Sequence, residues 1–131
     1  MHVTAPEKVI GRKNQQVVVE FTVQVKDGYH VNSSTPADEY LIPLKLTLAE
    51  GPASLLKVVY PKPTMEKFEF SQKPVSVLQG RFKTVAYINI LPTSATGATF
   101  LSGKLRYQAC NDRMCLPPRT LEVKVPLEIR N

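Results

Sequence analysis

The feature that most constrains this chain is an alternation of apolar and polar residues with a period of two. In residues 17–25, Val19, Phe21 and Val23 fall on one side, with polar residues between them. A period of two is typical of a β-strand with one buried face and one solvated face. Four further segments alternate as clearly, and two alternate more weakly: residues 44–48, 81–90, 103–109 and 121–129, then 53–60 and 74–79.

Turn signals separate these segments. Gly, Pro, Asp and Ser gather between the alternating stretches, at residues 26–28, 50–52, 61–63, 91–98 and 116–118. No segment has the apolar spacing of a helix. About seven strands at this spacing predict an all-β, immunoglobulin-like antiparallel β-sandwich. Because 131 residues is the length of one domain, we expect residues 1–131 to form a single unit.

The charge and the first residues narrow the possible functions. The formal net charge is +6 at pH 7, and the basic residues are scattered along the chain. Because nucleic-acid binding requires a basic stripe or interleaved exposed aromatics, we expect no nucleic-acid partner. A mildly basic surface instead favours an acidic protein partner.

The first ten residues lack the apolar segment of a signal peptide, so for an exported protein we expect the leader to be absent from this stretch.

The two cysteines of the chain lie close together, in what reads as the loop of a hairpin. Cys110 follows the alternating segment 103–109, and Cys115 precedes the segment 121–129. A connection this short places the two thiols within reach of a disulfide. A disulfide in turn implies an oxidising compartment or a redox pathway.

Two interpretations of this pair remain open from the residues alone. A structural disulfide that closes so short a loop stabilises a fold by roughly 2 kcal/mol, against about 4.7 kcal/mol for a loop of about 100 residues. A redox-active pair benefits from the same shortness, because each thiol resolves a mixed disulfide formed at the other. A zinc site is disfavoured, since such sites usually need four ligands and only His2 and His30 are available to join the thiols. We expect no metal and no cofactor.

The segment YQACNDRMCLPP, residues 107–118, resembles the signature of the N-terminal periplasmic domain of the DsbD thiol:disulfide interchange proteins. Two segments upstream add to the resemblance. VKDGYHVN, residues 25–32, is similar to a strand region of that family, and EKFEF, residues 66–70, falls where the family has a loop that caps the cysteines. The family fold is an immunoglobulin-like sandwich, in agreement with the strand count. The matching positions of the signature are Tyr107, Gln108, Cys110, Cys115, Pro117 and Pro118.

The resemblance implies a thiol–disulfide exchange module of the bacterial periplasm or cell envelope, with the activity of a protein-disulfide reductase domain. Such a module accepts electrons from a thioredoxin-like domain of a membrane reductase. It passes them through mixed disulfides to oxidised periplasmic proteins, among them those of cytochrome c biogenesis. By the same resemblance, Cys110 and Cys115 are the redox pair, Cys115 forms the intermolecular bond and Cys110 resolves it. Phe68 or Phe70 would cap the pair. The domain would be either part of a larger membrane protein or a free-standing relative.

Other residues near the pair are candidates for a role. Arg113 lies inside the cysteine loop, where its charge would lower the pKa of a thiol, but Asp112 beside it acts in the opposite direction. We therefore expect two solvated loop charges. His30 is expected at the same end of the sandwich, although a single histidine on a strand is more often a packing or surface residue. Glu69, together with Glu66, would tune proton transfer if the cap loop closes over the sulfurs.

A rival hypothesis from another class is a non-catalytic β-sandwich that binds a protein or a carbohydrate and carries a structural disulfide. A carbohydrate site requires aromatic residues exposed on one face. Here Trp is absent and the five tyrosines do not cluster in the sequence. The two hypotheses differ in one measurable property, the lability of the bond between Cys110 and Cys115.

Overall fold

The computed structural model describes residues 1–38 and 40–131, and these form twelve β-strands and no helix. The strands make three sheets of four strands each. In spatial order, the first sheet contains β1 (His2–Thr4), β3 (Gln16–Gln24), β9 (Arg81–Ile90) and β6 (Ala53–Val59). The second contains β2 (Val9–Arg12), β12 (Arg119–Arg130), β10 (Gly97–Tyr107) and β5 (Lys45–Leu48). The third contains β11 (Ala109–Cys110), β4 (His30–Asn32), β8 (Val75–Leu78) and β7 (Thr64–Glu66).

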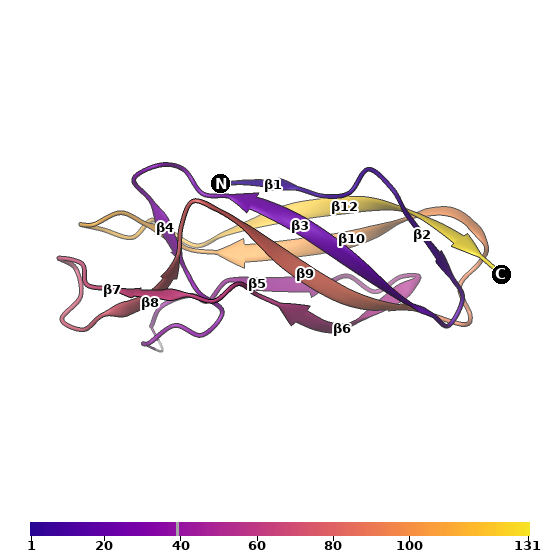
Figure 1. Ribbon diagram of the computed structural model, residues 1–131, viewed down its shortest axis with the longest axis horizontal. Coiled ribbons are helices and arrows are strands. Elements are labelled where there is room, and N and C mark those ends of the chain that lie inside the picture. Colours follow the sequence, from indigo (N-terminus) through magenta and orange to yellow (C-terminus); the bar gives the residue numbers. More distant parts are fainter. Residues whose placement is uncertain (39) are drawn as a thin grey trace.

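The first two sheets pack face to face (Figure 1), and the alternation in the sequence supplies their shared core. In β12, Val123, Val125, Leu127 and Ile129 are buried, whereas the residues between them are more exposed. β3, β9 and β10 bury alternate residues in the same way. Each aliphatic side chain that is fully buried stabilises the fold by about 1.5–3 kcal/mol relative to exposure. The predicted all-β sandwich is therefore confirmed.

The N-terminal segment joins both sheets of the sandwich. β1 pairs with β3 in the first sheet, where Val3 lies opposite Val23. β2 pairs with β12 in the second sheet, where Ile10 lies opposite Glu128. The chain therefore crosses from one sheet to the other between β1 and β2. The β2–β12 pair is parallel, and the other paired strands within the described residues are antiparallel.

The third sheet extends one end of the sandwich, at the left in Figure 1. The chain passes from β3 to β4 through a turn in which Tyr29 N donates to the Lys26 carbonyl (3.0 Å) and Gly28 has a φ of 84°. It passes from β8 to β9 through Gly80, with a φ of 71°. Glycine adopts such positive values readily because it has no Cβ. Val25 N donates to the Gly80 carbonyl at 2.8 Å, so the two bends are tied together.

The seven segments that alternate in the sequence are all strands in the structure. One of them, β10, starts earlier than the pattern predicts, because Gly97 and Ala98 belong to the strand and not to the preceding turn. Three short strands had no signal in the sequence, namely β1, β2 and β7. β4 falls within residues 25–32, which resemble a strand region, and β11 lies at the end of the predicted segment 103–109. Within the described residues there is no helix long and apolar enough to cross a membrane.

Candidate functional site

The two cysteines form a disulfide on the third sheet. Cys110 is the last residue of β11, and Cys115 lies opposite it in an isolated antiparallel bridge. Their Cα atoms are 4.0 Å apart, and the S–S distance is 2.08 Å. Cys110 is fully buried, with 0% of its surface exposed, whereas Cys115 is half-buried. The bond therefore presents Cys115, rather than Cys110, to the solvent.

The loop between the cysteines is held by main-chain hydrogen bonds as well as by sulfur. Asn111 N donates to the Met114 carbonyl at 2.9 Å. The Oδ1 atom of Asn111 accepts from the main-chain nitrogens of Arg113 (2.9 Å) and Met114 (2.8 Å), a common device for stabilising turns. Below the loop, Leu116 N donates to the Ala109 carbonyl at 2.8 Å. The hairpin thus has support that does not depend on the S–S bond.

His30 is the residue that β4 places next to the disulfide. In the antiparallel pairing of β11 with β4, Cys110 lies directly opposite His30. Directly opposite residues project to the same face of a sheet, with Cβ atoms about 4.5–5.5 Å apart. His30 is also buried, with 2% of its surface exposed. The structure therefore brings this histidine to the cysteine end, as expected, but as an interior group.

The cap loop, defined here as residues 67–74, covers His30 with an aromatic stack. The ring of Phe68 lies 4.2 Å from the His30 ring, and the planes are 13° apart. Phe70 lies beside Phe68, with 5.5 Å between the ring centroids, and its ring is 6.1 Å from that of His30. Glu69 N donates to the Asp112 carbonyl at 3.2 Å, which joins the cap loop to the cysteine loop. Of the two phenylalanines, Phe68 is the one that packs directly on the neighbour of Cys110.

The environment of His30 favours the neutral imidazole in the oxidised domain. Its pKa is lowered mainly because burial penalises the charged form, while the negative charge of Glu66 acts in the opposite direction. Glu66, the last residue of β7, accepts a hydrogen bond from Gln79 Nε2 at 3.1 Å. The Nε2 atom of His30 is buried and makes no hydrogen bond within residues 1–38 and 40–131.

Gln108 fixes the base of the cysteine hairpin, a role that the sequence did not reveal although this residue belongs to the YQAC segment. Its Oε1 accepts from Ile42 N (3.2 Å) and from Asn32 Nδ2 (3.3 Å). Its Nε2 donates to the Leu116 carbonyl at 3.3 Å. Asn32 also donates to the Ile42 carbonyl at 3.0 Å. One side chain therefore connects β4, the segment before β5 and the segment that follows Cys115.

The charged candidates lie on the surface of the two loops. Arg113, Asp112 and Glu69 are exposed, and their side chains take part in none of the ion pairs found in the described part of the chain. Glu69 and Asp112 meet through main-chain atoms alone. Within residues 1–38 and 40–131, no group of three or more His, Cys, Asp and Glu side chains is placed to bind a metal ion.

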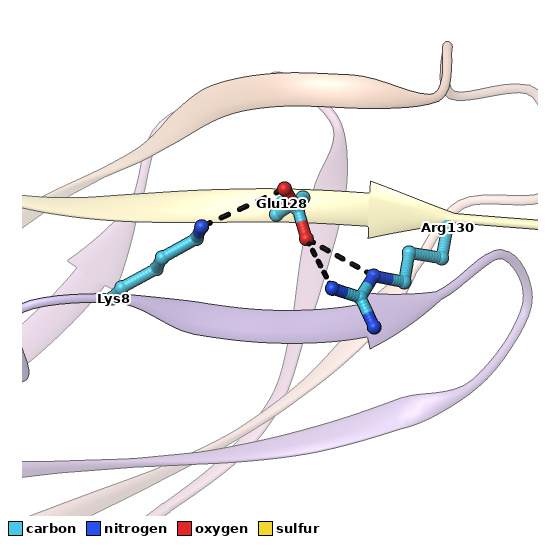
Figure 2. A network of polar contacts seen from close by, with 3 residues as sticks. All are labelled: Lys8, Glu128 and Arg130. Atoms are coloured by element: carbon cyan, nitrogen blue, oxygen red, sulfur yellow. Dashed lines mark hydrogen bonds and ion pairs between the residues drawn. The ribbon is translucent and has the colours of Figure 1, made fainter.

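The best-connected ion pairs lie far from the cysteines, near the C-terminal end of β12 (Figure 2). Glu128 contacts Arg130 Nη2 at 2.8 Å and Lys8 Nζ at 3.5 Å. The hydrogen bond from Arg130, followed by the charge of Lys8, lowers the pKa of Glu128. Along an extended strand, Glu128 is about 30 Å from Arg119 at the start of β12. Exposed pairs of this kind add little stability, and this group holds β2 beside β12 rather than serving the cysteines.

The site thus combines a disulfide in a short hairpin, with Cys115 the more exposed cysteine, and an aromatic loop beside it. The family model described as "Thiol:disulfide interchange protein DsbD, N-terminal" matches residues 2–127 of the chain. The chain therefore belongs to this family. A comparison with curated proteins finds no significant match.

Solved structures resemble the chain at low sequence identity. AggA, the major subunit of aggregative adherence fimbriae type I from Escherichia coli, is 8% identical, with a TM-score of 0.44, and the alignment covers 98% of this chain and 93% of that chain. The periplasmic chaperone SfaE is 13% identical, with a TM-score of 0.43, and the alignment covers 98% of this chain and 56% of that chain. The family match, and not these likenesses, carries the assignment.

Proposed function

We propose that this domain is a redox relay of the bacterial cell envelope. It accepts electrons from a thioredoxin-like domain of a membrane reductase and passes them to oxidised periplasmic proteins. One observation carries the proposal: a member of an interchange family holds its cysteine pair as a disulfide with Cys110 buried and Cys115 half-buried. A disulfide of this kind persists in an oxidising compartment such as the periplasm.

Reduction of the domain begins at Cys115, because it is the more exposed residue of the pair. A partner thiolate attacks Cys115 Sγ, the S–S bond breaks, and Cys110 leaves as a thiolate. The second thiolate of the partner then attacks the partner sulfur of the mixed disulfide and releases Cys115. The two electrons of the partner dithiol are now on this pair, its two protons have passed to the reduced domain, and the partner holds the disulfide.

Donation runs through the same atoms in the opposite sense. The Cys115 thiolate attacks a disulfide of an oxidised envelope protein and forms a mixed disulfide with it. Cys110 then attacks Cys115 Sγ, which re-forms the internal bond and releases the reduced protein. The short loop favours this step, because the resolving thiol stays beside the mixed disulfide at a high effective concentration.

The cap loop limits access to the pair between encounters, and we assign this role to Phe68 ahead of Phe70 because Phe68 packs directly on His30. Phe68→Ala is expected to speed alkylation of the reduced cysteines by iodoacetamide several-fold. Phe70→Ala is the matched control and is expected to have a smaller effect. Equal alkylation rates in the wild type and both variants would exclude a cap role for either ring.

The relay itself is tested by trapping mixed disulfides with a matched pair of variants. Cys110→Ser leaves the accessible thiol, and Cys115→Ser leaves the buried one. Each variant is mixed with a thioredoxin-like domain whose resolving cysteine has been replaced. The remaining cysteine of that domain carries an activated disulfide. The proposal predicts rapid trapping with Cys110→Ser and at least about tenfold slower trapping with Cys115→Ser. No trapping with either variant would leave the disulfide a structural one.

A further inference from the structure

The least explained group at the cysteine end is the imidazole of His30. It is 2% exposed, and its Nε2 atom makes no hydrogen bond within the described residues. A buried polar atom without a partner costs about 1–3 kcal/mol, so native proteins seldom keep one without a reason. An aliphatic or phenyl side chain would fill the same interior site without that cost. In the oxidised domain, the Nε2 atom of His30 therefore lowers the stability and makes no hydrogen bond that offsets this cost.

Reduction of the disulfide creates the partner that this nitrogen lacks. Cys110 lies directly opposite His30 in the β11–β4 ladder, so the two side chains share one face of the sheet. Phe68 covers the imidazole from the cap loop at 4.2 Å, and Cys110 is fully buried. In the disulfide the sulfur carries no proton. In the dithiol, Cys110 carries either a proton to give to Nε2 or a negative charge to be balanced.

We propose that His30 carries the proton of Cys110 in the reduced domain, so that Nε2–H donates a hydrogen bond to a Cys110 thiolate. This inference deepens the proposed function and rests on it. When a partner thiolate attacks Cys115, the S–S electron pair moves to Cys110, and one of the two protons of the partner dithiol comes to rest on His30. When Cys110 later attacks the mixed disulfide at Cys115, it does so already as a thiolate, and His30 releases the proton.

The charges around His30 are consistent with this role. From β7, Glu66 is the titratable neighbour that favours the protonated ring. From β11, Cys110 is the group across the ladder. The cap loop contributes the apolar ring of Phe68 at the imidazole, and its charged residues Lys67, Glu69 and Lys73 are exposed. In the oxidised domain burial outweighs Glu66 and keeps the ring neutral. A thiolate at Cys110, directly across the ladder, adds a second negative charge and reverses the balance.

The proposal predicts a redox-dependent titration of His30. Imidazole Cε1–H resonances are followed by NMR from pH 5 to 9 in the oxidised domain and in the domain reduced with a phosphine. His30 is expected to titrate at a higher pH in the reduced form, with thiolate absorbance at 240 nm at neutral pH. The resonances of His2, an exposed residue of β1, are recorded in both samples as the internal reference. A His30 titration that is the same in both redox states overturns the proposal.

A kinetic comparison tests the same proton without any protein partner. His30→Gln keeps a hydrogen-bonding side chain but carries no titrating proton, and His30→Phe serves as a second variant that keeps the stack on Phe68. With folding verified by circular dichroism, reduction of either variant by dithiothreitol should be roughly 10²-fold slower than in the wild type, the lower end for general acid–base catalysis. Reduction rates equal to the wild type contradict the role of His30. Failure of the trapping experiment contradicts the relay instead, and it leaves the redox-dependent titration of His30 unaffected.

Discussion

Reduction of the disulfide should weaken the fold only modestly. Cys110 and Cys115 are separated by 5 positions in the sequence, so the bond closes a loop of about six residues. The chain-entropy relation then gives a loss of about 2 kcal/mol in the free energy of unfolding on reduction. In the folded state the hairpin keeps the main-chain bonds of Asn111 to Met114 and of Leu116 to Ala109. The reduced domain is therefore expected to stay folded.

Urea unfolding of the oxidised and reduced domain measures this difference. Because the chain has no Trp, far-UV circular dichroism is the appropriate signal. With an m-value of about 2 kcal/mol/M, the expected loss moves the midpoint down by about 1 M urea. A double substitution, Cys110→Ala with Cys115→Ala, is the control for effects of the reductant and should behave like the reduced domain.

The same free energy links stability to redox function. In a thermodynamic cycle, the free energy by which the disulfide stabilises the fold equals the free energy by which folding stabilises the disulfide. About 2 kcal/mol corresponds to roughly 45 mV for a two-electron couple, so folding does little to protect the disulfide from reduction. A loss of more than about 4 kcal/mol, or unfolding on reduction, would refute this reasoning and make the disulfide a structural staple.

Two further predictions concern the residues around the hairpin. Gln108→Leu leaves three hydrogen-bonded groups without their partner. We therefore expect the free energy of unfolding in urea to fall by about 1–3 kcal/mol. An unchanged free energy would show that the hydrogen bonds of Gln108 do not stabilise the fold. The stability of the oxidised domain should fall as the pH drops below about 6.5, because burial lowers the pKa of His30 and the unfolded chain binds a proton that the folded chain does not. His30→Gln should flatten this dependence between pH 7 and 5, and an unchanged slope in urea midpoints would contradict the assignment.

The long strands could be predicted because one face of each strand is buried and the other is exposed to solvent. This holds for β3, β9 and β12, which alternate over nine, ten and twelve residues. Alternation does not predict the short strands, since two to four residues contain too few repeats. The signal of β8 is weak for a related reason, because all four of its residues are buried. The start of β10 was missed because Gly97 and its neighbours have turn composition.

The cysteine hairpin could be predicted from spacing, and His30 and the two phenylalanines were expected near it, but the contacts between these side chains could not be predicted. The disulfide links two residues of one loop, and local sequence determines that arrangement. The contact of His30 with Phe68, in contrast, joins β4 to the cap loop, and the pairing of His30 with Cys110 joins β4 to β11. Such contacts depend on how the strands of the third sheet pair, and the sequence does not give that pairing. The same limit left the choice between Phe68 and Phe70 open.

The most direct test of the relay is the reduction potential of the Cys110–Cys115 pair. The domain is equilibrated with glutathione or thioredoxin buffers, and the thiols are trapped by alkylation and quantified by mass. The relay predicts a value in the range of about −180 to −270 mV that known oxidoreductases occupy. A value well below about −300 mV, typical of structural disulfides, would contradict it.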